Sequence, residues 1–306
     1  MSPLETLIAG GKPALARALA RIEAESEAET VTTLLDAALA APRGHALGLT
    51  GPPGVGKSTL TKALIEHWRG AGLTVGVIAV DPSSRRSGGA LLGDRTRLGT
   101  DPADHGVFVR SMAARTRLGG VASITFPAMV LMRALYDRVI VETVGIGQSE
   151  TEIAGLCDLV TFCAQPGSGD ALQFMKAGVM EIPDIVLVTK ADLGDLARRA
   201  VSDLKGALSL AAARSDRPLP EVLSCSASRG EGIAAFVDAA ETRLAASAPR
   251  RSGQVRAWAD AHFTESFGRM GAELMSRAAD PAASHTPFRD VAALTARLRG
   301  AVATLL

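Results

Sequence analysis

The sequence carries almost no excess charge of either sign. Its 306 residues contain 33 Lys and Arg against 32 Asp and Glu. A chain without a strong field of one sign has little to hold the phosphates of DNA or RNA, or an anionic membrane surface. We therefore expect no nucleic-acid partner and no membrane partner.

Cysteine and clustered histidine are also scarce. The three cysteines, Cys157, Cys163 and Cys225, form no CxxC pair, and the five histidines are scattered. This spacing argues against a disulfide framework, and we expect buried free thiols. Delivery of a soft or borderline metal usually needs clustered Cys or His ligands, so a metallochaperone is disfavoured.

Long apolar runs are missing as well. None approaches the roughly 18 residues needed to span a bilayer. At the start of the chain, Leu4–Ile8 is too short for the apolar region of a secretory signal, and acidic residues follow it. We expect a cytoplasmic protein.

What the chain does have is a series of short apolar runs separated by helical patterns. Nearly half of its residues (47%) are hydrophobic, enough for a substantial core. The runs predicted to be strands are His45–Thr50, Thr74–Val80, Val107–Arg110, Arg138–Glu142, Asp158–Ala164, Asp184–Thr189 and Glu221–Ser224. The helices predicted between them are Ser58–Gly70, Val121–Tyr136, Leu193–Ala213 and Gly232–Ala246. This alternation predicts an α/β fold with a mainly parallel sheet covered by helices on both faces.

Helical periodicity marks both ends of the chain. Residues 3–40 predict two or three amphipathic helices, and two apolar stripes after residue 253 predict a C-terminal helical segment. We expect an N-terminal helical extension over residues 1–40, a core domain over 41–248 and a C-terminal helical arm over 249–306. The basic run Arg250–Arg256 is predicted to be a solvated linker.

A glycine-rich loop follows the first predicted strand. The loop matches the pattern GxxxxGK[ST] in full with Gly51, Pro52, Pro53, Gly54, Val55, Gly56, Lys57 and Ser58. A strand before it and a helix after it are the context that a phosphate-binding P-loop requires. Lys57 is predicted to bridge the β- and γ-phosphates and Ser58 to bind Mg²⁺, and Thr59 completes the predicted nucleotide contacts.

Two later strands end in carboxylates. The strand ending at Glu142 is followed by Gly145, so the carboxylate can hold Mg²⁺ and the glycine amide can approach a γ-phosphate. Asp81 follows another apolar strand and opens a long loop that reads as a switch. Within this loop, Asp81 or Asp94 is a candidate for orienting the attacking water, and the candidates for neutralising developing charge are Arg95 and Arg97.

A base pocket is predicted after the strand that ends near residue 189. Thr189, Lys190 and Asp192 stand where GTPases carry NKxD. The Asp192 carboxylate can accept two hydrogen bonds from the guanine edge, and adenine has no such donor pair. The stem of Lys190 can lie over the base. Ser226 and Ala227 resemble the short SA signature, in which a backbone amide donates to the guanine keto oxygen. Thr189 stands where GTPases usually carry Asn, and its hydroxyl can replace only part of the contacts that Asn makes with the phosphate loop.

Three longer stretches extend these motifs. They read Asp81-Pro-Ser-Ser…Gly88-Gly89…Gly93-Asp94-Arg-Thr-Arg97, Glu142-Thr-Val-Gly-Ile-Gly-Gln148-Ser-Glu150, and Gln165-Pro-Gly-Ser-Gly-Asp170-Ala-Leu-Gln-Phe-Met-Lys176-Ala-Gly-Val-Met-Glu181. Together they resemble the MeaB/ArgK (MMAA-type) family of SIMIBI-class P-loop GTPases. The resemblance runs from about residue 40 to about residue 245, and the helical ends fit the family plan.

The resemblance implies a GTPase chaperone of an adenosylcobalamin-dependent acyl-CoA mutase. Such a protein uses Mg²⁺ and GTP/GDP to gate cofactor loading and to protect or reactivate the mutase. The C-terminal arm would form a homodimer, and a cobalamin adenosyltransferase is a further implied partner. The catalytic residues carried over are Lys57, Asp81, Asp94, Glu142, Gln148 and Lys176, and those near the metal are Ser58, Asp81, Asp94 and Glu142.

Lys176 belongs to a segment, Asp170–Glu181, that resembles the extra switch through which the family senses its partner. Three rival functions stay open: a metallochaperone, a nucleotide-dependent kinase or ATPase, and a nucleotide-regulated binding module with negligible turnover. A kinase would need an acceptor pocket and a catalytic base, and it gives no use for Asp192. Comparing GTP with ATP binding separates the kinase from the others.

Overall fold

The protein is built on one parallel sheet. The computed structural model describes residues 1–82, 98–114, 122–143, 152–167, 182–212, 218–246, 250–278 and 280–305. Within them, a seven-stranded sheet has the order β3-β2-β4-β1-β5-β6-β7, and each neighbouring pair is parallel. The strands are β1 (His45–Thr50), β2 (Val75–Pro82), β3 (Val107–Ala114), β4 (Arg138–Glu142), β5 (Leu159–Ala164), β6 (Ile185–Val188) and β7 (Glu221–Ser224). The predicted parallel α/β fold is confirmed.

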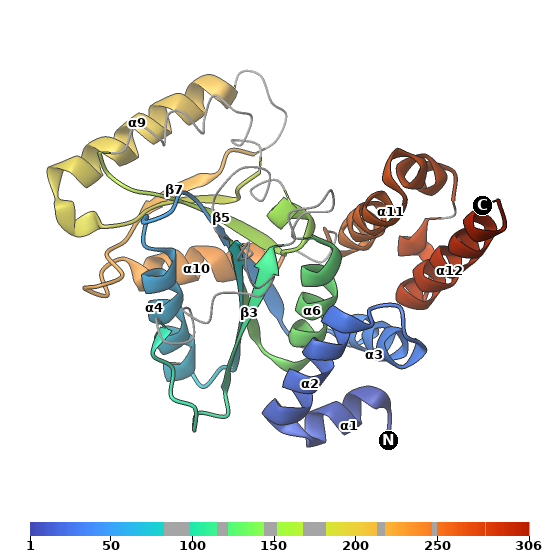
Figure 1. The fold of residues 1–306 in the computed structure, drawn as a ribbon. Helices are drawn as coiled ribbons and strands as arrows, with labels where there is room; N and C mark the ends of the chain where they lie inside the picture. The colour runs from blue at the N-terminus through green and yellow to red at the C-terminus, as the bar shows by residue number, and fades with distance from the viewer. Residues whose placement is uncertain are drawn as a thin grey trace.

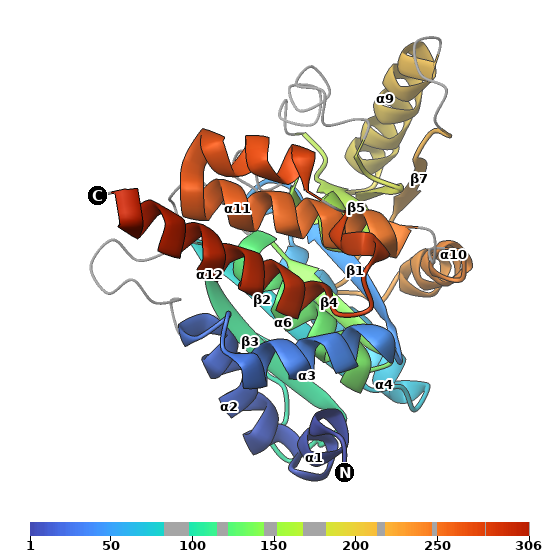
Figure 2. The same ribbon diagram turned by 90° about the vertical axis from the view of Figure 1, so that its right-hand side faces the viewer.

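Helices cover both faces of this sheet (Figures 1 and 2). One face packs against α4 (Lys57–Gly70) and α10 (Ile233–Leu244), and the other against α6 (Ala122–Leu135). At the β5–β7 end of the sheet, α9 (Asp195–Ala212) contributes its own smaller apolar cluster. Alternate side chains along each strand enter opposite clusters, because successive side chains of a strand point to opposite faces.

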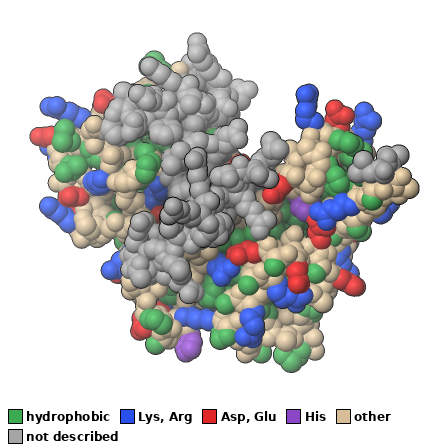
Figure 3. Space-filling view, in the orientation of Figure 1, with side chains coloured by type: hydrophobic (Ala, Val, Ile, Leu, Met, Phe, Trp, Pro, Cys, Tyr) green, Lys and Arg blue, Asp and Glu red, His purple; other side chains and the backbone are tan. Residues whose placement is uncertain are grey.

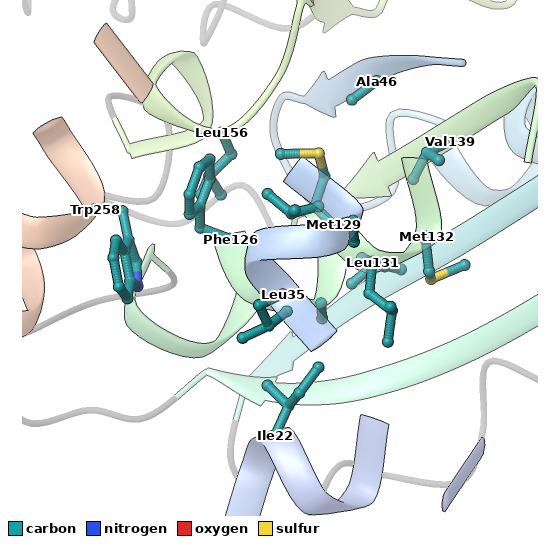
Figure 4. Packing of buried hydrophobic residues seen from close by; sticks show 14 of the residues in the cluster. Ile22, Leu35, Ala46, Phe126, Met129, Leu131, Met132, Val139, Leu156 and Trp258 are labelled. Atoms are coloured by element: carbon teal, nitrogen blue, oxygen red, sulfur yellow. The ribbon is translucent and has the colours of Figure 1, made fainter. Parts of the chain in front are cut away.

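Both ends of the chain pack on the α6 face. The N-terminal helices are α1 (Pro3–Ala9), α2 (Gly11–Ala24) and α3 (Glu29–Ala40), and the C-terminal ones are α11 (Arg250–Arg277) and α12 (Pro287–Leu305). Figure 4 shows Ile22 and Leu35 in one cluster with Phe126 of α6 and Trp258 of α11. The rings of Trp258 and Phe288 lie 4.5 Å apart between centroids, so α11 and α12 share this core. The domain boundaries near residues 40 and 248 stay a prediction.

The helix α11 folds back on itself. Gly268 has φ 62° and ψ −143°, which breaks the helix there. The returning segment packs so closely that a Cβ on Gly271 would lie 2.0 Å from the carbonyl oxygen of Phe263. The apolar stripe predicted for this arm is therefore divided, with Trp258 and Phe263 buried and Met270 exposed.

The basic run at the start of α11 is a structural anchor, and the prediction of a solvated linker is wrong. Arg250 donates to both carboxylate oxygens of Asp184, at 2.5 and 2.7 Å. Arg251 donates through Nε to Asp158 Oδ1 at 3.0 Å. Asp158 is fully buried and also pairs with Arg133, whose pKa burial lowers to about 10. A buried charge requires such pairing, so Asp158 ties the arm to the sheet.

Cys157, Cys163 and Cys225 are free and buried, as predicted, and burial raises the pKa of Cys163 to about 12. On the described part of the face in Figure 3, basic and acidic side chains are interspersed. No helix in the described segments has the length and apolar character that crossing a membrane requires.

Candidate nucleotide-binding site

The P-loop joins β1 to α4 at the carboxyl edge of the sheet. Gly51 has φ 135°, and a Cβ there would lie 2.2 Å from the carbonyl oxygen of Cys163 on β5. Gly56 has φ 102° and directly precedes the helix. A side chain at position 51 would collide with the neighbouring strand, and one at position 56 would strain the backbone. These glycines thus allow the tight curl that a phosphate-binding loop needs.

Lys57 lies inside this curl. Its side chain is buried, and its Nζ donates to the carbonyl oxygens of Gly51 at 2.6 Å and of Pro52 at 3.1 Å. Pro53 and Gly54 are exposed on the loop, and Thr59 is exposed on the first turn of α4. The ammonium and the N-terminus of α4 both favour an anion at this position.

Glu142 faces the P-loop from the end of β4. Its Oε1 accepts a hydrogen bond from Ser58 Oγ at 2.7 Å, and its Oε2 accepts one from Thr61 Oγ1 at 2.9 Å. The motifs predict that Ser58 lies near Glu142, but they do not predict that Thr61 also contacts Glu142. The spacing contains the signal, because residues three apart in a helix lie on one face.

The Ser58 hydroxyl and the Glu142 carboxylate fit Mg²⁺. Mg²⁺ prefers hard oxygen ligands and is usually held by one or two protein groups together with phosphates and water. The two side chains approach within 2.7 Å at the edge of the P-loop, and the hydroxyl oxygen keeps lone pairs while it donates its proton. The described residues contain no group of three or more His, Cys, Asp or Glu that could hold a metal ion, but Mg²⁺ beside a phosphate does not require one.

The strand end at β6 is tied to the P-loop by two side chains. Thr189 Oγ1 lies 2.7 Å from the carbonyl oxygen of Val55 and 3.0 Å from that of Ala164. Lys190 has φ 54°, and its Nζ donates to the carbonyl oxygen of Gly54 at 2.9 Å. It also donates to Gln165 Oε1 at 2.6 Å. The Lys190 side chain therefore reaches from the end of β6 to the phosphate loop. The base is predicted to lie against the stem of this side chain.

Asp192 lies on the short helix η3 (Ala191–Leu193) and is held from the segment that follows β7. Ser226 Oγ donates to Asp192 Oδ1 at 2.7 Å, and this hydrogen bond holds the pKa of Asp192 below its ordinary value. The Ser226 amide donates to the carbonyl oxygen of Glu231, while within the described chain the Ala227 amide has no acceptor. Ser226 thus links an ionised carboxylate to the residue that carries this open amide.

The other predicted residues belong largely to segments outside the described residues. These are Asp94, Arg95, Arg97, Gly145, Gln148 and Lys176. For Asp81 only the backbone is described. It lies near the end of β2, two residues beyond Ala79, which is opposite Glu142 in the adjacent strand. Asp81 and Glu142 thus lie at the same edge of the sheet.

Comparison with known proteins gives one family. Residues 15–276 match the family model described as methylmalonyl Co-A mutase-associated GTPase MeaB. The chain is 38% identical over 230 residues to GTPase ArgK of Escherichia coli, covering 73% of this chain and 70% of that protein. It is 38% identical over 249 residues to the mouse protein named methylmalonic aciduria type A homolog, mitochondrial, covering 76% of this chain and 60% of that protein. The match spans only 62% of the length of a putative GTPase of Pyrococcus horikoshii, to which it is 46% identical over 198 residues.

Solved structures share the fold. A protein named LAO/AO transport system kinase is 29% identical to this chain, and its structure superposes with a TM-score of 0.64, covering 90% of this chain and 95% of its own. Nickel-bound HypB from Helicobacter pylori is 17% identical with a TM-score of 0.52, covering 70% of this chain and 94% of its own. This second likeness concerns the fold alone.

Proposed function

Because the chain belongs to the MeaB family of P-loop GTPases, we propose that it binds and hydrolyses Mg-GTP to serve an adenosylcobalamin-dependent acyl-CoA mutase. The observation that carries the nucleotide part is the meeting of three groups at one sheet edge. They are the P-loop with Lys57, the Ser58–Glu142 pair, and Asp192 held ionised by Ser226. In this proposal the first group would bind the phosphates, the second would bind Mg²⁺, and the third would bind the guanine base.

The phosphate side of the proposal rests on Lys57 and the loop. Lys57 donates to two P-loop carbonyls, so a bound β- or γ-phosphate would compete for the same ammonium. Phosphate oxygens carry more negative charge than carbonyl oxygens and therefore make the stronger, charge-assisted bonds. Ser58 and Glu142 would hold Mg²⁺, which neutralises phosphate charge when bound.

The base side of the proposal favours guanine. Asp192 keeps its carboxylate ionised, and a carboxylate only accepts hydrogen bonds. Guanine offers a ring N–H and an amino group on one edge, whereas adenine would leave the carboxylate without donors. In this proposal the Ala227 amide would donate to the guanine keto oxygen, and the Lys190 stem would cover the ring.

Hydrolysis requires residues of the predicted switch segments. We assign Asp81 and Asp94 to the metal and the attacking water, Gln148 to catalysis, and Lys176 to partner sensing. These assignments rest on motif spacing and on the sheet edge that Asp81 shares with Glu142. We further propose a cytoplasmic homodimer that gates cofactor loading and reactivation of the mutase, with a cobalamin adenosyltransferase as a further partner.

The experiment is GTP turnover by the purified full chain with and without a candidate mutase. We expect slow hydrolysis alone and at least several-fold faster hydrolysis with the mutase, because partner binding would fix the catalytic arrangement of the switch residues. Lys57→Ala is the control, since it should abolish turnover in both conditions. A parallel assay with ATP tests the kinase or ATPase alternative, which the name of the LAO/AO transport system kinase also suggests.

The outcomes separate the parts of the proposal. GTP turnover that no plausible mutase stimulates would overturn the chaperone role while leaving the GTPase. A preference for ATP would overturn the assignment of Asp192 to guanine. If stimulation is observed, Lys176→Ala should reduce the stimulated rate toward the basal rate.

A further inference from the structure

Glu142 is held by two hydroxyls, and Ser58 is only one of them. The second, Thr61 Oγ1, lies 2.9 Å from Glu142 Oε2, the carboxylate oxygen that Ser58 does not contact. Thr61 is completely buried, whereas Ser58 is half-buried at the edge of the P-loop. The two donors lie one turn apart on α4 and bind one carboxylate oxygen each.

The two hydroxyls would have different tasks at a bound metal. Ser58 belongs to the P-loop motif, and its oxygen is the predicted metal ligand. Thr61 lies deeper in the helix, and its hydroxyl proton is directed at the carboxylate. A charge-assisted hydrogen bond from a buried donor fixes the rotation of the carboxylate plane. Ser58 would thus be a ligand of the metal, and Thr61 would hold the carboxylate through its other oxygen.

Glutamate makes this support useful. A Glu side chain has one more rotatable bond than Asp and loses correspondingly more conformational freedom when it is held in place. Groups that orient a metal ligand commonly account for a 10- to 100-fold difference in metal affinity. A glutamate at the end of β4 therefore gains more from a second anchor than the shorter aspartate would.

We propose that Thr61 is a positioning residue that presets the Glu142 carboxylate for Mg²⁺ at the nucleotide site. The inference rests on the proposed Mg–nucleotide site and adds to it a residue outside the P-loop motif. Its prediction concerns the metal, because the Thr61 hydroxyl contacts Glu142 rather than the P-loop backbone. Nucleotide binding without metal should therefore be nearly unchanged in a Thr61 variant.

The test measures release of a fluorescent GDP from the full chain as the Mg²⁺ concentration is varied. In the wild-type protein, Mg²⁺ should slow release. In Thr61→Val, a substitution of similar shape without the hydroxyl, the Mg²⁺ concentration for half of this effect should rise about tenfold. With EDTA present, the release rates of the two proteins should agree within about twofold.

Two further variants make the result specific. Thr61→Ser keeps a hydroxyl and should restore most of the wild-type Mg²⁺ dependence. Thr32→Val removes another buried threonine hydroxyl, on α3, which bonds only to carbonyls of its own helix among the described residues. It should leave the Mg²⁺ dependence unchanged. Thermal unfolding identifies variants that fail to fold, and Thr61→Ala replaces Thr61→Val if that variant does.

Each outcome decides a different claim. Release that does not respond to Mg²⁺ even in the wild-type protein would overturn the proposed metal–nucleotide site and this inference with it. A wild-type response that Thr61→Val leaves unchanged would overturn the inference alone. An equal shift in Thr61→Ser and Thr61→Val would also overturn it, because the effect would then come from shape and not from the hydroxyl.

Discussion

At the scale of single residues, threonine hydroxyls hold the groups around the phosphate loop. Thr61 contacts Glu142, and Thr189 contacts the carbonyl oxygen of Val55. The Thr189 hydroxyl lies 2.7 Å from the P-loop and is buried. Threonine at position 189 thus keeps the tie between the base pocket and the phosphate loop, but it has no amide group to offer the base.

We expect Thr189→Val to weaken GDP binding by up to about tenfold. The substitution keeps the shape and leaves the buried carbonyls of Val55 and Ala164 without this donor, a cost of about 1–3 kcal/mol. Part of that cost appears as a loss of folding stability and part as a looser P-loop. Titration with a fluorescent GDP measures the affinity, and Thr189→Ser is the matched control. Wild-type affinity in Thr189→Val would contradict the proposed tie.

At this scale, the sequence predicts some contacts of the site and does not predict others. The proximity of Ser58 and Glu142 is predictable because a P-loop and the end of a neighbouring parallel strand meet at one sheet edge. The sequence predicts a role for Ser226 only through its backbone, yet its side chain holds Asp192. Such contacts depend on rotamers and on chain segments that are distant in sequence, and residue spacing does not specify them.

At the scale of elements, α11 is fixed to the amino-terminal edge of the sheet by its first turn. Arg250 and Arg251 reach Asp184 and Asp158, the residues that precede β6 and β5. Asp158 Oδ2 also accepts a hydrogen bond from the Ala46 amide at 2.8 Å, so the carboxylate joins β1 to the arm.

We expect Asp158→Asn to lower the free energy of unfolding by about 3–5 kcal/mol, because it leaves Arg133 as a buried charge without its carboxylate. Arg133 is 1% exposed in its side chain. Urea denaturation followed by fluorescence of Trp258 and Trp68 gives this energy. The control is Asp195→Asn, which breaks a pair with Arg198 that is about three-quarters exposed. Exposed pairs contribute little, and equal effects of the two substitutions would contradict the anchor.

The strands are the elements that the sequence predicts best. Three are predicted with their observed bounds: β1, β4 and β7. Periodicity alone does not separate a short apolar run from a buried helical segment, but the short length of these runs and the turn residues beside them favour strands. By contrast, β3 continues to Ala114, four residues beyond its prediction, because pairing with β2 extends through a segment that has no β-branched or aromatic residue to indicate a strand. The break in α11 is not predicted, because one glycine inside a helical pattern is usually tolerated.

At the scale of the whole molecule, the terminal helices and the sheet form one structure. Asp36 of α3 accepts a hydrogen bond from the Phe288 amide at 2.9 Å, so an N-terminal helix caps α12. The α6 face is covered jointly by the first and last segments of the chain (Figure 2). Sequence periodicity predicts that these helices exist, but contacts between the two ends of the chain leave no local pattern.

We expect a chain that lacks residues 249–306 to lose cooperative unfolding and to aggregate. The deletion would expose Phe126 and its neighbours, which pack against Trp258 and Phe288. Large exposed apolar patches promote association. Size-exclusion chromatography and thermal unfolding of the truncated and full-length chains provide the measurement. A well-behaved truncated protein with a sharp transition would instead support the predicted domain boundary near residue 248.

The cap on α12 also has a consequence for biosynthesis. Asp36 and Phe288 are 252 positions apart, so the ribosome must translate almost the entire chain before they can meet. Domains usually fold as units from the N-terminus during synthesis, but here the apolar face of α6 cannot be closed until the last helices have left the exit tunnel. The nascent chain therefore leaves part of this face uncovered from the emergence of α6 (Ala122–Leu135) until α12 (Pro287–Leu305) has emerged, and during that interval a general folding chaperone could bind it.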